Sequence, residues 1–356
     1  MAEDFLVVED LKTWFPIKSG VLQRTSGYVK AVDGVSLKLR KGETYGLVGE
    51  TGSGKTTLGK SILRLIEPTS GTVILRGTNI TEASKREVKK LRRRMQIIFQ
   101  DPYASLDPRE TVGSMLSEAM RVHKLVSSRS EALRRSKELL LRVGLNEEHL
   151  FRFPHEFSGG QRQRIAVARA LAVDPDFIVL DEPTSFLDVS VQSQVLDLLK
   201  DLQKELDLTY LFVSHNLAVV QYMSNRVGVM YLGKLMEDAG REALFKSPEH
   251  PYSYFLMSAI PVPDPDFRKE TKLLTGDVPS PVNIPPGCRF HPRCPYATEK
   301  CKSGVVPFYP GEGPQHEVAC HYNVDFNRST QTLRPEYAAE VTELTSVLKQ
   351  PDGSGI

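Results

Sequence analysis

Short apolar runs alternate with stretches of helical spacing along most of the chain, and this pattern predicts a mostly parallel sheet of the α/β class. Residues 58–65 carry apolar side chains at helical spacing and follow the first run, at 45–48, after a glycine-rich stretch. The runs have the length of buried strands and lie at 45–48, 97–99, 177–180, 210–213 and 227–232.

The N-terminal part alternates apolar and polar residues, which predicts strands at 5–11 and 29–39 and a short strand at 71–75. Residues 16–27 are polar and contain glycine, so we expect an exposed loop between the first two strands.

Residues 110–170 are mostly helical in pattern. The spacing Ser128-x-x-Glu131 predicts a capping box at a helix start, and Gly144 predicts the end of the same helix. The stripe predicted to be buried on this helix consists of Leu133, Leu139, Leu140 and Val143.

The composition changes after about residue 240, where prolines become frequent and the four cysteines follow. We expect a small appended domain at 241–330, reached through a semi-rigid connection, and a tail at 331–356 with one helix. The part before it, 1–240, is long enough for one large core.

Composition and charge are ordinary for a soluble globular protein, with 40% hydrophobic residues, 25% charged residues and a net charge of +2. The charge therefore gives no reason to expect nucleic acid as a partner. The basic run at 85–94 is expected to be a solvated helix face, with contact to anionic lipid or a partner as the alternative. No apolar stretch approaches the roughly 18 residues of a membrane span, and the acidic N-terminus is unlike a signal peptide. We expect a cytosolic protein without structural disulfides.

The strongest chemical signal is the run 49–56, which fits the phosphate-binding pattern G-x-x-x-x-G-K-S/T at every fixed position, between a predicted strand and helix. Its glycines let the backbone N–H groups point at a phosphate, and the helix adds the positive end of its dipole. Lys55 would reach the β- and γ-phosphates, and the Thr56 hydroxyl would bind Mg²⁺. The candidate nucleotide-binding residues are Gly49, Glu50, Thr51, Gly52, Ser53, Gly54, Lys55, Thr56 and Thr57.

A second signal is the pair Asp181 and Glu182 at the end of the predicted strand 177–180. Beside a phosphate loop, Asp181 could hold Mg²⁺ and Glu182 could accept a proton from an attacking water. The alternative is a surface turn of two solvated acids. The stretch 158–161, Ser-Gly-Gly-Gln, opens a further predicted helix whose start can bind an anion.

With these motifs in this order, the chain resembles an ATP-binding subunit of an ABC transporter. The landmarks that carry the resemblance are the phosphate loop at 49–56, Gln100, the signature at 158–161, Asp181 with Glu182, Asp188 and His215. The resemblance implies ATP and Mg²⁺ as cofactors. It also implies a P-loop NTPase core at 1–240, with an N-terminal antiparallel β subdomain and a helical signature subdomain at about 101–170.

The resemblance further implies that two such subunits dimerise head to tail, with each ATP between one phosphate loop and the other subunit's signature. Gln100 would contact Mg²⁺ and the lytic water, His215 would contact the γ-phosphate, and Asp188 would cross the dimer interface. A core or surface histidine is the alternative for His215. The signature residues that would act on the partner's ATP are Ser158, Gly159, Gly160 and Gln161.

In this family an aromatic residue upstream of the phosphate loop stacks on adenine. Counting back suggests Tyr28, with Trp14 and Phe15 as alternatives. Ordinary packing is the alternative role for such a residue.

Finer matches resemble the dipeptide/oligopeptide importer branch, over about residues 5–325 and with features of its second ATPase. The matching stretches are 100–109, 181–192, 250–252 and 259–261. Two positions depart from the branch, Asp107 where asparagine is usual and Phe186 where alanine is usual.

The branch implies ATP hydrolysis that powers peptide import from the cytoplasmic face of the membrane. It implies as partners a sister ATP-binding subunit, two transmembrane permeases and, indirectly, an extracellular solute-binding protein. The alternatives are an identical partner ATPase, oligosaccharides or nickel as cargo, an exporter subunit, and a soluble ABC-type ATPase acting on ribosomes or DNA.

The four cysteines lie close together in the proline-rich C-terminal extension, and their gaps do not fit the Cys-x-x-Cys spacing of zinc ribbons or bacterial ferredoxins. A small unit with little apolar sequence gains stability from a metal clamp. Importers of this branch carry a 4Fe–4S cluster at such cysteines, so the resemblance implies one at Cys288, Cys294, Cys301 and Cys320. The alternatives are reduced thiols and zinc, the latter with His291, His316 or His321.

Overall fold

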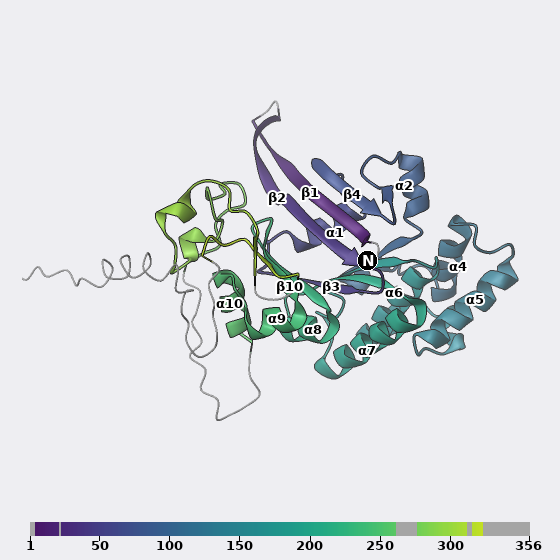
Figure 1. Ribbon diagram of the computed structural model, residues 1–356. Coiled ribbons are helices and arrows are strands. Elements are labelled where there is room, and N and C mark those ends of the chain that lie inside the picture. The colour runs from purple at the N-terminus through teal and green to yellow at the C-terminus, as the bar shows by residue number, and fades with distance from the viewer. Residues whose placement is uncertain (1–3, 21–22, 261–275, 312–314, 323–356) are drawn as a thin grey trace, which may run out of the picture.

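Figure 1 shows the computed structural model, which describes residues 4–20, 23–260, 276–311 and 315–322. A small sheet near the N-terminus and a large central sheet enclose helix α1 (Lys55–Ile62). Helix α1 begins at Lys55 rather than at residue 58 as predicted, because Gly54, the last glycine of the phosphate loop, is its N-cap.

Within the described residues the large sheet has eight strands, and five neighbouring ones are parallel, which confirms the predicted α/β class. In spatial order these five are β9 (Arg226–Tyr231), β3 (Thr44–Val48), β8 (Thr209–Val213), β7 (Phe177–Asp181) and β6 (Met95–Ile98). Beyond β9 the sheet continues antiparallel through β10 (Lys234–Gly240), β12 (Glu317–Val318) and β11 (Tyr309–Pro310).

Strand β10 is absent from the sequence-based prediction because two acids interrupt its apolar pattern. Glu237 and Asp238 are nevertheless buried, and each has a partner of opposite charge: His316 Nε2 lies 2.7 Å from Glu237, and Arg226 Nη2 lies 2.7 Å from Asp238. Both partners come from elsewhere in the chain, so the pattern of β10 by itself does not reveal why the acids are tolerated.

The N-terminal sheet is antiparallel, in the order β2 (Arg24–Arg40), β1 (Asp4–Ser19), β4 (Ser70–Leu75) and β5 (Thr78–Asn79). The loop predicted at 16–27 is wrong, because β1 and β2 pair as far as Ser19 and Arg24. Backbone hydrogen bonds, which residues of almost any type can make, hold this hairpin together while most of its side chains face solvent. The strands β1 and β2 of this hairpin extend toward the top of Figure 1.

The predicted helical region contains α4 (Val112–Val122), α5 (Arg129–Arg142) and α6 (Gly159–Leu171). The basic run at 85–94 lies mainly on α2 (Lys85–Leu91), and its charged side chains are mostly exposed, as predicted. The remaining helices are α3 (Pro102–Ser105), α7 (Val189–Leu206), α8 (Leu217–Met223), α9 (Arg241–Lys246), α10 (Pro251–Ser258), and the 3₁₀ turns Glu147–Phe151, Pro154–Glu156, His291–Arg293 and Glu299–Lys302.

Helix α5 corrects two details of the prediction. Ser128 accepts from the Glu131 backbone N–H, but the Glu131 carboxylate accepts from Ser127 at 2.8 Å, so the box closes one residue earlier. Leu133 is 38% exposed and the prediction that it is buried is wrong, since the inner face runs through Ala132 instead. The other three residues of the stripe are buried, and Gly144 ends the helix with a φ of 71°.

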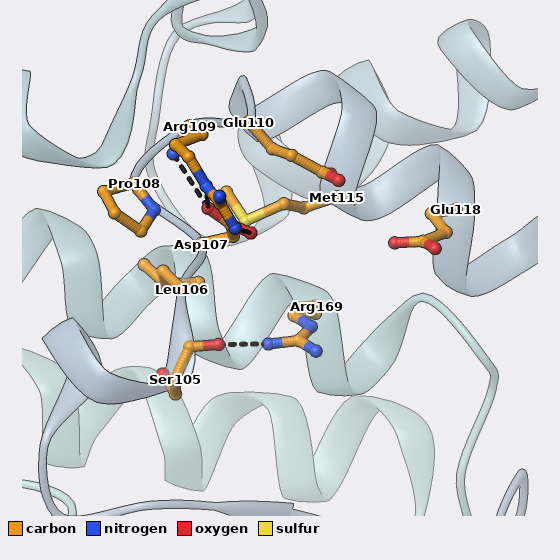
Figure 2. Close-up of a pocket in the computed structure, with 9 residues that line it drawn as sticks. All are labelled: Ser105, Leu106, Asp107, Pro108, Arg109, Glu110, Met115, Glu118 and Arg169. Carbon is orange, nitrogen blue, oxygen red and sulfur yellow. Dashed lines mark hydrogen bonds and ion pairs between the residues drawn. The ribbon is translucent and has the colours of Figure 1, made fainter.

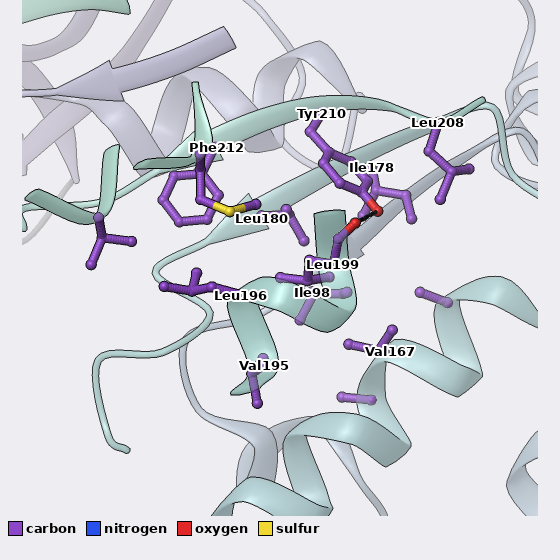
Figure 3. Packing of buried hydrophobic residues seen from close by; sticks show 14 of the residues in the cluster. Ile98, Val167, Ile178, Leu180, Val195, Leu196, Leu199, Leu208, Tyr210 and Phe212 are labelled. Carbon is purple, nitrogen blue, oxygen red and sulfur yellow. Dashed lines mark hydrogen bonds between the residues drawn. The ribbon is translucent and has the colours of Figure 1, made fainter. Parts of the chain in front are cut away.

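Alternation along the strands of the large sheet builds a core on each face. On β7, Ile178 and Leu180 face α6 and α7, and Figure 3 shows them with Val167, Leu199 and other apolar side chains of that core. Phe177 and Val179 of the same strand point to the opposite face, toward α1 and the N-terminal sheet. The sheet is therefore buried on both sides, and this rigid support carries the loops at its edge.

The C-terminal extension packs beside β10 and contributes β11 and β12 to the sheet edge. The boundary at 240 stays a prediction. The tail predicted at 331–356 and the segment 261–275 lie outside the described residues. Among the helices that the structure describes, none combines the length and the apolar character needed to cross a bilayer.

Candidate functional site

Four parallel strands deliver candidate residues to one edge of the large sheet. The phosphate loop follows β3, Gln100 follows β6, Asp181 and Glu182 lie at the end of β7, and His215 follows β8. The carboxyl ends of neighbouring parallel strands meet at one edge, so residues distant in sequence become neighbours there.

The phosphate loop requires glycine at two positions because other backbone segments approach it closely. A Cβ at Gly49 would lie 2.1 Å from the Met230 carbonyl oxygen, and one at Gly54 would lie 2.0 Å from the Ala31 carbonyl oxygen. Both residues also have φ in the left-handed region, at 149° and 104°. The loop is therefore clamped between β2 and the end of β9.

Lys55 lies inside this loop. Its Nζ donates to the carbonyl oxygens of Gly49 and Glu50, at 2.8 and 3.0 Å, and to Ser53 Oγ at 3.2 Å. Burial lowers the pKa of Lys55, and the carboxylates of Glu182, Asp181 and Glu50 offset part of that effect. The loop thus holds a buried ammonium group where the motif needs a positive charge.

Thr56 and Asp181 form a pair of oxygen donors beside the loop. Thr56 Oγ1 donates to Asp181 Oδ1 at 2.7 Å, and the Asp181 side chain is 4% exposed. Burial raises the pKa of Asp181, while the hydrogen bond from Thr56 lowers it. A hydroxyl and a carboxylate are ligands that Mg²⁺ prefers, so this donor set fits the predicted ion.

Glu182 receives two side chains from neighbouring strand ends. Gln100 Nε2 donates to Glu182 Oε2 at 2.9 Å, and His215 Nδ1 lies 3.1 Å from the same oxygen. Glu182 itself has a φ of 49°, an uncommon conformation for a residue with a side chain. The structure thus brings together the three residues predicted to be catalytic.

The signature residues form a helix start elsewhere on the chain. Ser158 Oγ accepts from the Gln161 N–H, and Gln161 Oε1 accepts from the Ser158 N–H at 3.0 Å, which makes a capping box for α6. Gly160 packs against α7, since a Cβ there would lie 2.3 Å from Val191 Cγ1. In the described part of the chain, no hydrogen bond or ion pair joins residues 158–161 to residues 49–57 or to Glu182.

Asp188 lies beside exposed apolar side chains. It is the N-cap residue of α7, and its side chain makes no capping hydrogen bond. Phe186 is 69% exposed and Val189 is 80% exposed. The phenylalanine that departs from the family pattern thus has most of its surface in solvent.

The aromatic candidates lie together on the N-terminal hairpin. Tyr28 is 45% exposed, and its ring centroid lies 6.1 Å from that of Trp14. Trp14 has other contacts as well, because its Nε1 donates to Asp33 and Lys30 Nζ lies 4.6 Å from its ring. Phe15 is 39% exposed. The assignment of Tyr28 to adenine stays a prediction.

An open groove lies below the segment that follows Gln100, and Figure 2 shows its lining. Asp107 accepts from the Arg109 backbone N–H at 2.9 Å and from its guanidinium at 3.2 Å, so it shapes the turn as an asparagine also could. Arg169 of α6 donates to the Ser105 carbonyl oxygen across the groove. The groove therefore connects the segment after Gln100 to the signature helix.

The structure joins none of the four cysteines in a disulfide, and all four line one small, mostly apolar cavity. Burial raises the pKa of Cys288 to about 11 and also raises that of Cys294. His291 and His321 line the same cavity, but the suggestion of His316 as a zinc ligand is wrong, because His316 pairs with Glu237. Among the described residues, no group of three or more Cys, His, Asp or Glu side chains is placed to hold a metal ion. The metal stays a prediction.

Sequence reasoning missed two residues at the phosphate loop. Arg293 of the extension pairs with the Glu50 carboxylate, and Tyr252 of α10 accepts from the Glu50 N–H at 2.9 Å. Both come from beyond residue 240, where the sequence predicts a separate domain. Two signals were available, the matching stretch 250–252 and the position of Arg293 next to Cys294, but neither indicated a contact with the phosphate loop.

The chain matches two family models. The first, described as ABC transporter, covers residues 32–185, and the second, described as the C-terminal region of oligopeptide/dipeptide transporters, covers 236–301. The oligopeptide transport ATP-binding protein AppF of Bacillus subtilis is 49% identical over 322 residues, or 90% of this chain and 97% of that protein. A putative peptide import ATP-binding protein of Brucella ovis is 52% identical over 298 residues, or 84% of this chain and 93% of that protein.

Solved structures share the fold of about two thirds of the chain. A dimeric ATP-binding cassette in a post-hydrolysis state, bound to ADP and Pi, is 28% identical with a TM-score of 0.59, and covers 66% of this chain and 98% of that one. The cbiO1 protein of Clostridium perfringens, part of an ABC transporter complex, is 29% identical with a TM-score of 0.58, and covers 68% of this chain and 91% of that one.

Proposed function

This chain belongs to the ABC transporter family, in its oligopeptide/dipeptide branch, and from this premise we propose a role for each site residue in ATP hydrolysis. The chain is the ATP-binding subunit that powers peptide import. The observation that carries the proposed roles is the convergence of Gln100 and His215 on one oxygen of Glu182, next to Asp181.

Residues 49–57 bind the phosphates of ATP, and Lys55 neutralises the β- and γ-phosphates. Thr56 and Asp181 would hold Mg²⁺, and Gln100 would add a further oxygen. The ion supplies charge neutralisation at the transferred phosphate. Tyr28 stacks on adenine. The paired oxygen donors of Thr56 and Asp181 support this assignment.

Glu182 is the general base, accepting a proton from the attacking water. Gln100 orients this water, and His215 contacts the γ-phosphate. Both side chains hold one oxygen of Glu182, so the carboxylate is oriented before the substrate arrives.

The signature, Ser158 to Gln161, and Asp188 act on the ATP of a partner subunit in a head-to-tail dimer. Two observations support this proposal: the signature makes no hydrogen bond to this chain's own phosphate loop within the described residues, and apolar side chains next to Asp188 are exposed. Phe186 and Val189 are both exposed within three residues of each other, and neighbouring exposed apolar side chains can form part of a surface that another protein covers. The partner would be a sister ATP-binding subunit.

The groove of Figure 2 docks the two transmembrane permeases, at the cytoplasmic face of the membrane. It lies between the segment after Gln100 and α6, so movement there would reach both the catalytic cluster and the signature. An extracellular solute-binding protein would act only through the permeases.

The cysteines Cys288, Cys294, Cys301 and Cys320 hold a 4Fe–4S cluster, with zinc as the alternative. The support is that all four cysteines line one cavity, and thiolates are the usual ligands of such clusters. The cluster would supply a cross-link within a part of the chain that has little regular secondary structure.

Replacing Glu182 by glutamine tests the proposed hydrolysis. Glu182→Gln keeps the shape and the partners but cannot accept a proton, so ATP binding should persist while turnover falls about 100-fold or more. The measurements are equilibrium ATP binding and steady-state phosphate release by the assembled transporter. Undiminished hydrolysis in this variant would falsify Glu182 as the base.

A further inference from the structure

Arg293 reaches from the C-terminal extension into the phosphate loop. Its guanidinium meets the Glu50 carboxylate with both nitrogens, at 2.7 and 3.1 Å, in the two-pronged geometry that fixes direction as well as distance. The Arg293 side chain is 7% exposed and that of Glu50 is 26% exposed. Little solvent therefore screens the pair, unlike an ordinary surface ion pair.

Glu50 is held at three points. Arg293 binds its carboxylate, Tyr252 accepts from its N–H at 2.9 Å, and Lys55 Nζ donates to its carbonyl oxygen at 3.0 Å. A displacement of Glu50 therefore moves the backbone that Lys55 contacts. The hydrogen bond with Glu50 also raises the pKa of Arg293, so the guanidinium stays charged.

Arg293 is itself fixed among the cysteines. It lies in the turn His291–Arg293, and its N–H donates to the Phe290 carbonyl oxygen at 3.0 Å. Phe290 packs on Tyr231 and Tyr252, with ring centroids 5.5 and 5.3 Å away. Cys288 and Cys294 flank this turn, and the Cys288 N–H donates to the Cys301 carbonyl oxygen at 2.9 Å. The turn thus contacts the phosphate loop on one side and the cysteine cavity on the other.

The charges of Glu50 and Arg293 indicate that this contact favours ATP binding. Glu50 is an acid within a loop that must receive a polyanion, and an unpaired carboxylate there would repel the phosphates. The guanidinium of Arg293 cancels its charge. We propose that Arg293 is a positioning residue for ATP, which holds Glu50 in place and couples the phosphate loop to the cysteine-lined segment 288–301.

This proposal rests on the proposed role of residues 49–57 in binding ATP, and titration of the full-length protein with MgATP tests the two separately. Lys55→Ala should abolish measurable binding; if it does not, the proposed ATP site itself is wrong. Arg293→Met should raise the dissociation constant about tenfold, because it leaves Glu50 unpaired and less restrained. Unchanged affinity in Arg293→Met, with binding lost in Lys55→Ala, would overturn this inference alone.

Arg289→Met is the matched control. Arg289 also anchors the extension and is 5% exposed, but its partners are Asp33 and the Leu232 carbonyl oxygen, outside the phosphate loop. This variant should change the affinity for MgATP less than twofold. An effect equal to that of Arg293→Met would mean that Arg293 only anchors the extension and has no specific role at the phosphate loop. Glu50→Gln added to Arg293→Met should restore most of the affinity, because it removes the unpaired charge. A double variant as weak as Arg293→Met contradicts the electrostatic argument.

The effect of ATP binding on the segment 288–301 is measurable in the unmodified protein. This experiment therefore tests the coupling even if a variant does not fold. Coupling between two sites is reciprocal, so MgATP should slow hydrogen exchange in 288–301 as well as in the phosphate loop. Protection of the loop with no change in 288–301 would refute the coupling.

Discussion

At the scale of single residues, Glu182 shows how backbone conformation serves the site. Its φ of 49° is uncommon for a residue with a side chain, and its N–H donates to the Val213 carbonyl oxygen at 2.9 Å. This bond ties the residue to the end of β8, two residues before His215. The sequence motif predicts which acid follows β7, but the direction of its carboxylate depends on the neighbouring strand.

The variant Gly160→Ala tests the proposed role of the signature, because the glycine packs too closely against α7 to leave room for a side chain. An alanine Cβ at this position would lie 2.3 Å from Val191 Cγ1, so Gly160→Ala should displace the start of α6 at a cost of about 1–3 kcal/mol. We expect ATP turnover to fall about tenfold or more, while binding of ATP to the phosphate loop changes less than twofold, because in the proposed dimer these residues would contact only the partner's nucleotide.

The control is the double variant Gly160→Ala/Val191→Ala, in which the Val191 methyl group that would clash with the new Cβ is absent. Turnover should recover to within a few-fold of the unmodified protein. If the double variant stays as slow as the single one, the glycine serves something other than this close contact.

At the scale of elements, the start of α10 combines a cap with a buried histidine. The ring Nδ1 of His250 accepts from the Tyr252 backbone N–H at 3.0 Å, and the Glu237 carboxylate accepts from the backbone N–H of His250 at 2.9 Å. His250 is 1% exposed, and burial lowers its pKa from 6.5 to about 4. The cap therefore works with a neutral ring.

The lowered pKa of His250 predicts that the protein loses stability in acid. The folded state binds fewer protons at His250 than the unfolded state between pH 6.5 and about 4, so the free energy of unfolding falls as the pH drops through this window. From pH 7 to pH 5 the loss from this group is about 2 kcal/mol. His250→Asn keeps a capping oxygen without a titrating ring, and should flatten the decline in urea unfolding by that amount. An equal decline in both proteins would contradict the prediction.

The elements that the sequence pattern misread share one cause. The hairpin arms in 16–27 and strand β10 contain polar residues where a strand is expected to be apolar. In the hairpin those residues face solvent, whereas in β10 they are buried with partners from other segments. Polar residues in a strand can therefore be either exposed or buried, and only the positions of the neighbouring segments distinguish the two cases.

At the scale of the whole molecule, the extension is part of the central sheet and of its edge site. Strands β12 and β11 continue the sheet beyond β10, and the Arg293–Glu50 pair joins the extension to the phosphate loop. The sequence predicts a separate domain beyond residue 240, yet Arg293 of that part contacts Glu50 in the phosphate loop. These segments are far apart along the chain, and the fold makes them neighbours.

The proposed cluster is tested on protein purified without oxygen. We expect about four iron atoms and about four acid-labile sulfides per chain, and removal of the metal should speed hydrogen exchange in 276–322 more than in the parallel strands, because the clamp lies in the extension. Stoichiometric zinc without iron would exclude the cluster, and a chain that holds neither metal would leave the cysteines as free thiols.

The sequence by itself determined the family, the parallel core and the identity of the phosphate-loop and acidic residues, because these follow from local spacing: a glycine-rich turn between a strand and a helix, and acids at a strand end. Only the tertiary structure decided which partners orient Glu182, why Glu237 and Asp238 can be buried, and that Arg293 contacts Glu50. These contacts join residues from 12 to 243 positions apart, with 82 between Gln100 and Glu182. No local pattern encodes such pairings, because they depend on which strands and loops become neighbours in the folded chain.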